Sequence, residues 1–212
     1  MKAVLLDFDG TLLDSVELIV AGYRHMMQVH RGRAYPDELW LRGIGTPLLT
    51  QIREFARDED EVPALLETYR DWVIENHDRL ARPFPGVADA VRALHQQGVA
   101  LAIVTSKRRV GVERGLPVLG LQDVLTCWIT PDEVTHGKPH PESVWLAMEQ
   151  LGVEAADTCF VGDSPHDLEA GRAAGVTTVA VGWGPFSRGR LQELHPDHWL
   201  DEPAQLATLG AL

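Results

Sequence analysis

Residues 4–12 read VLLDFDGTL, and the interpretation of the whole chain starts from this stretch. Its first three residues are apolar, and a short apolar run that ends at a turn signal indicates a buried strand. Alternation along a strand places Asp7 and Asp9 on the same side of the backbone, and Gly10 allows the chain to turn directly after them. Two carboxylates are therefore expected to share a small volume.

Paired carboxylates need something positive between them. Two like unit charges about 4 Å apart repel each other by roughly 4 kcal/mol at an effective dielectric constant of about 20. The aspartate pair is therefore expected to hold a cation, a shared proton or both. The alternative is a structural turn in which each aspartate side chain accepts hydrogen bonds from nearby backbone amides. The residues downstream decide between these two interpretations.

Length and charge limit the possible functions. The 212 residues suffice for one large domain or for a domain with a sizeable insertion. Nineteen basic and 31 acidic residues give a formal net charge of −12, which repels nucleic acids and anionic membrane surfaces. We therefore expect neither as a partner, and a small phosphorylated substrate needs a locally positive pocket. The first strand begins near residue 3 and no apolar run approaches about 20 residues, so neither a signal peptide nor a membrane span is expected.

The cysteines and tryptophans are expected to be structural. Cys127 and Cys159 lie in apolar, strand-like runs, which favours buried free thiols and a cytoplasmic protein over a disulfide framework. His195 and His198 lack an obvious third ligand, so no metal site is expected there. The oligomeric state stays open between a monomer and a homodimer. Core packing is expected for the five tryptophans in predicted helices or strands, which are Trp40, Trp72, Trp128, Trp145 and Trp199.

An all-helical segment is predicted between residues 15 and 81. Apolar residues recur there at helical spacing, and no part of it is typical of a strand. A first helix starts near Ser15, short helices follow near residues 36–40 and 48–55, and a long one spans about 62–80. The loop at residues 42–47, RGIGTP, lies between two of these helices.

From residue 82 onward the pattern changes to alternating helices and strands. A proline-rich hinge at residues 82–86 opens this part of the chain. Apolar strands separated by helices of about ten residues indicate an α/β fold with a doubly wound, mostly parallel sheet. We expect residues 1–14 and 82–212 to form this core, with residues 15–81 inserted as a helical cap domain. Strands are predicted at 99–104, 124–129, 158–161, 176–181 and 198–200, and helices at 87–97, 109–119, 141–151, 165–174 and 203–209.

Polar side chains follow several of the predicted strands. In doubly wound folds, ligands bind beyond the carboxyl ends of the strands. Each of these residues alone has an ordinary explanation, for example a helix cap for Thr105 and a solvated surface residue for Lys138. Together they are expected to meet at one edge of the sheet. The candidate residues are Asp7, Asp9, Thr105, Ser106, Lys138, Asp163 and Asp167.

These residues resemble the four motifs of the haloacid dehalogenase-like hydrolase superfamily. The motifs appear in order, as DFDGTL at 7–12, Thr105, Lys138 within GKPHP, and GDSPHD at 162–167. The resemblance covers nearly the whole chain, because the helical segment lies where the family places its cap domain. It implies a Rossmann-like α/β core and an enzyme that transfers phosphoryl groups, because the dehalogenases of the superfamily lack the acid corresponding to Asp9.

The resemblance also implies a role for each residue. Asp7 would be the nucleophile, charged at neutral pH because an ordinary aspartate pKa is near 3.9, and would form an aspartyl-phosphate. Asp9 would protonate the leaving group and then activate water. Thr105 and the amides near Ser106 would hold phosphoryl oxygens, and Lys138 would neutralise the negative charge.

Mg²⁺ is the cofactor that the resemblance implies, because oxygen ligands suit a hard octahedral cation. Its expected ligands are Asp7, the backbone carbonyl of Asp9 and Asp163, while Asp167 binds directly or lies just outside the ligands. In the cap loop, Arg42 either binds an anionic end of the substrate or is simply solvated.

The expected function is therefore a magnesium-dependent phosphatase of a small phosphorylated metabolite, similar to phosphoglycolate phosphatase. Three alternatives stay open. The first is a phosphomutase of the beta-phosphoglucomutase type, which passes the phosphoryl group to a sugar. The second is an inorganic pyrophosphatase. The third, which the complete set of motif residues disfavours, is a non-catalytic regulatory binding protein.

Overall fold

A sheet of six parallel strands lies at the centre of the larger part of the protein. The computed structural model describes all residues, 1–212. The α/β fold and the parallel sheet predicted from the sequence are confirmed. The strands, in their order across the sheet, are β5 (Cys127–Ile129), β4 (Ala100–Val104), β1 (Ala3–Leu6), β6 (Thr158–Gly162), β7 (Thr177–Val181) and β8 (His198–Leu200).

Strand β1 occupies the middle of this sheet and fixes the position of the site. Leu5 is paired with Ala102 of β4 on one side and with Phe160 of β6 on the other. From β1 the chain runs to β4 and β5, and then crosses back to build β6, β7 and β8 on the opposite side. Such a change in direction opens a crevice at the carboxyl ends of the central strands, which is where ligands bind in this class of fold.

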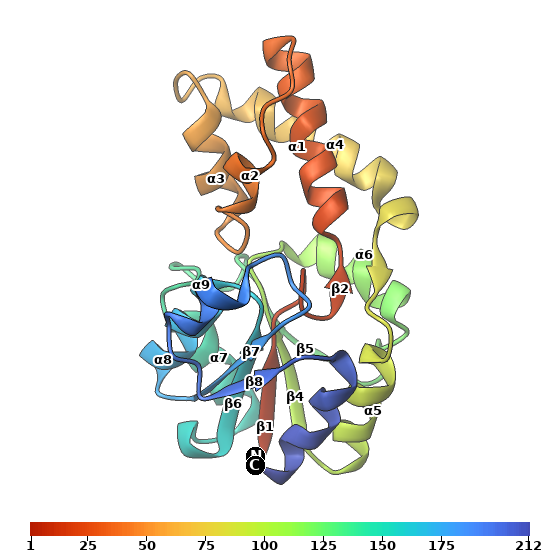
Figure 1. Cartoon of the computed structure of the whole chain (residues 1–212), viewed down its shortest axis with the longest axis vertical. Helices are drawn as coiled ribbons and strands as arrows, with labels where there is room; N and C mark the ends of the chain where they lie inside the picture. The colour runs from red at the N-terminus through yellow and green to blue at the C-terminus, as the bar shows by residue number, and fades with distance from the viewer.

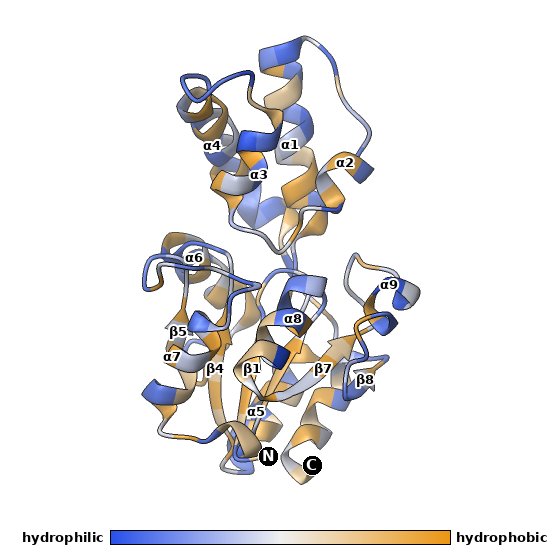
Figure 2. Ribbon diagram, turned by 90° about the vertical axis from the view of Figure 1, so that its left-hand side faces the viewer, coloured by the Kyte–Doolittle hydropathy of each residue, from blue (hydrophilic) through white to orange (hydrophobic).

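Alternating side chains of the strands pack on two helical layers. Val4 and Leu6 belong to a core cluster that includes residues of α5 (Val87–Gln96) and α6 (Arg109–Leu119). Leu5 faces the opposite cluster. That second cluster includes residues of α7 (Glu142–Leu151) and α8 (Pro165–Ala174). The inner strands are therefore apolar on both faces, as the hydrophobic colour of β1 and β4 in Figure 2 shows.

Four helices form a separate body at one end of the molecule, and both chain termini lie at the opposite end (Figure 1). We call this body, residues 15–81, the cap. Its centre is aromatic: Trp40 is fully buried and stacks on Tyr23 with ring centroids 4.6 Å apart. The helices are α1 (Val16–Arg31), α2 (Glu38–Leu41), α3 (Leu48–Phe55) and α4 (Val62–Leu80).

The two chain crossings between cap and core pair with each other. Strand β2 (Leu13–Asp14) and strand β3 (Arg82–Pro83) form a small antiparallel sheet. The sequence predicted only a proline-rich hinge at this point. Two residues on each side are too few for any periodicity, so this pairing could be found only in three dimensions.

The structure corrects several details of the sequence interpretation. Strand β5 is shorter than predicted, and the last helix is a 3₁₀ helix, η2 (Pro203–Ala211). Two short helices, η1 (Ala155–Asp157) and α9 (Arg188–Gln192), were not predicted. The expectation of core packing is wrong for Trp145, whose exposed fraction is 48%, because it lies on the outer face of α7.

Both cysteines are free, with Cys159 buried and Cys127 half-buried. No helix combines the length and apolar composition required to span a membrane.

The aromatic centre of the cap gives a testable stability difference. Trp40→Ala is expected to lower the free energy of unfolding by about 3–5 kcal/mol, because it removes a fully buried ring and leaves a cavity. Trp145→Ala, the matched control at an exposed position, should change it by no more than about 0.5 kcal/mol. Urea denaturation followed by circular dichroism measures both values. Equal losses in the two variants would contradict this assignment of the cap core.

Candidate active site

A buried lysine connects the acidic residues at the carboxyl ends of the strands. Lys138 is only 3% exposed. Its Nζ donates hydrogen bonds of 2.6 Å to Asp7 Oδ1, 2.6 Å to Asp167 Oδ1 and 3.2 Å to the carbonyl oxygen of Val104. One ammonium group therefore compensates two carboxylates, and these negative charges raise the pKa of Lys138 against the opposing effect of burial.

Asp7 lies directly after β1, where its backbone N–H donates to the carbonyl oxygen of Val161 at 2.9 Å. Burial raises the pKa of Asp7 to about 7, and the attraction of Lys138 only partly opposes this. The nearby charge of Asp167 raises the pKa further. The expectation that Asp7 is charged at neutral pH stays a prediction. Further positive charge near Asp7 would favour its ionised form.

Asp163, at the end of β6, has an oxygen atom without a partner. Its Oδ1 accepts a hydrogen bond of 2.7 Å from the hydroxyl of Thr11, whereas its Oδ2 is buried and accepts none. Burial, together with the charges of Asp7 and Asp167, raises the pKa of Asp163 well above its ordinary value. An unpaired buried acceptor is costly, so this oxygen is suited to binding a cation.

Gly10 allows the backbone to approach this carboxylate. Its φ is +89°, and a Cβ atom at this position would lie 2.5 Å from Asp163 Oδ2. A larger residue would therefore be strained and would clash with the carboxylate. Carboxylate oxygens of Asp7, Asp163 and Asp167 lie within 4.8 Å of one another. This buried set of hard oxygen donors fits Mg²⁺.

Asp167 differs from the other two acids because both of its carboxylate oxygens accept hydrogen bonds within the protein. Its Oδ2 accepts hydrogen bonds from the N–H and the hydroxyl of Ser164, at 3.0 and 2.6 Å, in a capping box at the start of α8. Its Oδ1 accepts the bond from Lys138. Of the two possibilities left open by the sequence, these contacts favour a position just outside the metal ligands, where Asp167 orients the lysine.

Asp9 is held by a residue that the sequence interpretation missed. Lys107 Nζ lies 2.8 Å from Asp9 Oδ1 and 3.0 Å from Oδ2, and the hydroxyl of Ser15 donates to Oδ1 at 2.6 Å. Lys107 directly follows the predicted phosphate-binding residues Thr105 and Ser106. Inspection of all the residues that follow β4, rather than of the motif residue Thr105 alone, could have found Lys107.

The cap reaches the site through its loop at residues 42–47. The hydroxyl of Ser106 donates a hydrogen bond of 2.6 Å to the carbonyl oxygen of Gly45, so this side chain binds the cap. The hydroxyl of Thr105, 5% exposed, accepts from the N–H of Lys107 at 3.1 Å. A Cβ atom on Gly45 would lie 2.8 Å from the hydroxyl of Ser164, which shows how closely the loop covers the core.

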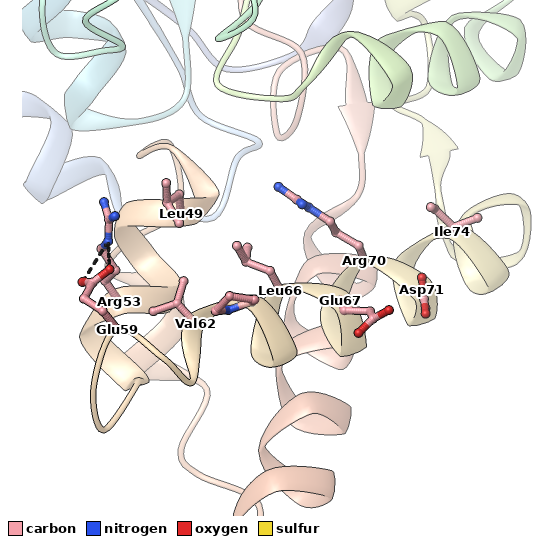
Figure 3. A pocket seen from close by; sticks show the side chains of 10 residues that line it. Leu49, Arg53, Glu59, Val62, Leu66, Glu67, Arg70, Asp71 and Ile74 are labelled. Carbon is pink, nitrogen blue, oxygen red and sulfur yellow. Dashed lines mark hydrogen bonds and ion pairs between the residues drawn. The ribbon is translucent and has the colours of Figure 1, made fainter.

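Arg42 and Arg70 are cationic residues of the cap whose guanidinium groups have no hydrogen-bonded partner. Arg42 is exposed and lines a groove of about 410 Å³ between α2 and the core, together with His166 and Arg190. Arg70, which sequence reasoning did not single out, lines a larger groove of about 670 Å³ between α3 and α4. Figure 3 shows the side chains of Leu66 and Arg70 pointing toward the core. The larger groove therefore lies on the cap and not at the aspartates, which are covered.

A Rossmann-like sheet with aspartates and a lysine at its strand ends, covered by a helical cap, defines one class of hydrolase. The model of the haloacid dehalogenase-like hydrolase family matches residues 4–181. The chain is 34% identical over 209 residues to pyrophosphatase PpaX of Oceanobacillus iheyensis, covering 99% of this chain and 96% of the relative. It is 35% identical to pyrophosphatase PpaX of Anoxybacillus flavithermus, again covering 99% of this chain and 96% of the relative.

Solved structures agree with this fold. A haloacid dehalogenase-like hydrolase from Bacteroides fragilis, so described, has a TM-score of 0.89 and 26% identity, covering 97% of this chain and 99% of that one. A protein described as a "predicted phosphoglycolate phosphatase" from Haemophilus somnus has a TM-score of 0.89 and 23% identity, covering 99% and 97%. The chain belongs to the haloacid dehalogenase-like hydrolase family. It is a phosphatase of that family.

Substitution of Lys138 tests how much its ammonium group stabilises the folded protein by compensating the buried carboxylates. Lys138→Met is expected to lower the free energy of unfolding by about 3–5 kcal/mol, because Asp7 and Asp167 lose their shared partner while staying buried. The measurement is urea denaturation at neutral pH. The control is Lys2→Met, which removes an ion pair at the surface and should leave the stability unchanged. Unchanged stability in Lys138→Met would contradict the central role of the ammonium group.

Proposed function

We propose that this protein is a magnesium-dependent phosphatase that hydrolyses a small phosphorylated compound through an aspartyl-phosphate on Asp7. The observation that carries the proposal is the buried arrangement of Asp7, Asp163 and Lys138. Asp7 and Lys138 are in direct contact, and Asp163 keeps one buried oxygen without a hydrogen-bonded partner. Family membership supports the same chemistry.

In the first half-reaction, a carboxylate oxygen of Asp7 attacks phosphorus while the bond from phosphorus to the leaving oxygen breaks. Lys138, 2.6 Å from Asp7 Oδ1, stabilises the negative charge of the nucleophile and of the transferred group. The leaving oxygen takes a proton from Asp9. In the second half-reaction, water gives a proton to Asp9 and bonds to phosphorus, phosphate leaves, and the carboxylate of Asp7 is restored.

Asp9 needs two protonation states for these steps. Its side chain contacts the ammonium group of Lys107 and the hydroxyl of Ser15. Since Ser15 begins the cap and Ser106 binds the loop at residues 42–47, we propose that movement of the cap and the contacts of Asp9 are connected.

Mg²⁺ would be held by the side chains of Asp7 and Asp163 and by the backbone carbonyl of Asp9, with Asp167 outside the ligands. When bound, it supplies positive charge that favours the ionised form of Asp7 and stabilises phosphoryl oxygens. Thr105 and the amides near Ser106 complete the set of groups proposed to hold the phosphoryl group.

Inorganic pyrophosphate is the first substrate to test, because the curated relatives that match 99% of the chain carry the name pyrophosphatase. Phosphoglycolate is the second, in line with the resemblance to phosphoglycolate phosphatase. The guanidinium groups of Arg42 and Arg70 have no hydrogen-bonded partner on the cap, and a substrate with a second anionic group is the kind that they would bind.

The assignment of the nucleophile is tested by substitution. Asp7→Asn is expected to lower kcat for pyrophosphate or a phosphate monoester by at least about a thousandfold, because an amide oxygen is a poor nucleophile. The control, Asp89→Asn, changes an exposed aspartate on α5 and should keep full activity. Release of inorganic phosphate measures both. Interconversion of sugar phosphates without phosphate release would instead indicate a mutase, and full activity of Asp7→Asn would disprove the mechanism.

The metal requirement is tested separately. Treatment with EDTA should abolish hydrolysis, and added Mg²⁺ should restore it. Asp163→Asn is expected to raise the Mg²⁺ concentration needed for half-maximal activity by more than about tenfold, because an amide is a weaker ligand than a carboxylate. Thermal unfolding with and without Mg²⁺ gives a second measure of binding to each variant. Full activity in EDTA would rule out the magnesium requirement.

A further inference from the structure

Three side chains converge on the surface of the loop that precedes α7. They are His136, His140 and Glu142, with exposed side-chain fractions of 63%, 46% and 30%. The Nδ1 atom of His136 lies 2.9 Å from Glu142 Oε2, and the Nδ1 atom of His140 lies 3.9 Å from the same oxygen. The two imidazole rings are 4.8 Å apart between centroids. None of these residues has a role in the mechanism proposed above.

The spacing of the donor atoms fits a single metal ion. Ligands about 2.0–2.1 Å from a tetrahedral metal are roughly 3.4 Å from one another. The two distances to Glu142 Oε2, 2.9 and 3.9 Å, lie on either side of this value, and one donor atom from each residue lies within 4.8 Å of the others. An ion pair explains the contact of His136 with Glu142, and a metal ion would in addition join His140 to the same carboxylate.

The surrounding backbone orients these ligands. Glu142 accepts hydrogen bonds from the N–H groups of Thr135 and His136, at 2.8 and 2.9 Å, which fix its carboxylate toward the two rings. The Nδ1 atom of His140 accepts a long hydrogen bond of 3.3 Å from the N–H of Glu142, and a metal ion on this nitrogen would replace that bond. Ligands fixed by neighbouring hydrogen bonds are typical of protein metal sites.

We propose that His136, His140 and Glu142 form a binding site for a divalent transition metal such as Zn²⁺ or Ni²⁺, separate from the Mg²⁺ site. Two imidazoles and one carboxylate select such ions over Mg²⁺, which prefers oxygen ligands. Three protein ligands at the surface leave at least one coordination position for water. The two histidines lie two residues before and two residues after Lys138. A bound ion therefore bridges the two ends of the segment that carries the buried lysine.

Binding is tested on the intact protein without an affinity tag, in a buffer with excess Mg²⁺ that occupies the aspartate site. Calorimetric titration with Zn²⁺ is expected to give one ion per chain. Affinity should fall by more than about tenfold in His136→Ala and in His140→Ala, each of which loses one ligand. Glu142 is left unchanged because it also binds the backbone of the loop. The matched control is His198→Ala, which removes an exposed histidine elsewhere and should bind Zn²⁺ as the parent protein does.

A spectroscopic measurement locates the ion. The ring of Trp145 lies 6.1 Å from that of His140, so Ni²⁺ in the site should quench the fluorescence of Trp145. In Trp145→Phe this quenching by Ni²⁺ should be absent. Asp163→Asn should keep both signals, because its altered carboxylate belongs to the Mg²⁺ site. Saturable binding lost in both histidine variants and kept in Asp163→Asn supports the proposal. No saturable binding, or binding that the two histidine variants retain, overturns it. Loss of Zn²⁺ binding in Asp163→Asn also overturns it, and none of these results depends on the phosphatase activity.

Discussion

The buried ammonium group of Lys138 is the interaction on which the site depends. It lies between Asp7 and Asp167, 2.6 Å from each, and both carboxylates are almost fully covered. Without it, β1 and α8 would bring two negative charges together inside the protein, which is strongly unfavourable. Even with it, burial raises the pKa of Asp7 to about 7. Positive charge in addition to that of Lys138 would favour the ionised form of Asp7.

The cap lies beside the site because it is inserted in the chain directly after Asp7 and Asp9. The cap helices are inserted between the first aspartates and the rest of the core, so both chain crossings lie close to the site. Ser15 at the start of α1 binds Asp9, and Gly45 in the cap loop binds Ser106. The cap therefore contacts one proposed catalytic residue and one proposed substrate-binding residue, in addition to covering them.

Much of the site could be predicted because strand ends are visible in a sequence. Asp7, Thr105 and Asp163 each follow an apolar run, and parallel strands bring their carboxyl ends to one edge of the sheet. Their chemical roles stay predictions that the proposed experiments test. Lys107 and Arg70 were missed, because a lysine beyond a motif and an arginine on a helix look like ordinary surface residues. Only the fold shows that Lys107 contacts Asp9 across nearly one hundred residues of sequence, and that Arg70 points toward the core.

The sequence by itself determined the α/β class, the inserted helical segment and the residues gathered at the strand ends. These features depend on local hydrophobic patterns and on motif order, which one chain displays directly. Tertiary structure decided the pairing of β2 with β3, the partner of Asp9, the burial of Asp7 and the meeting of His136 with His140. Each of these depends on burial or on distances between side chains, which no local pattern encodes. The stretch at residues 4–12 thus specified where the proposed chemistry lies, and packing around it determined which of its side chains are buried and what they contact.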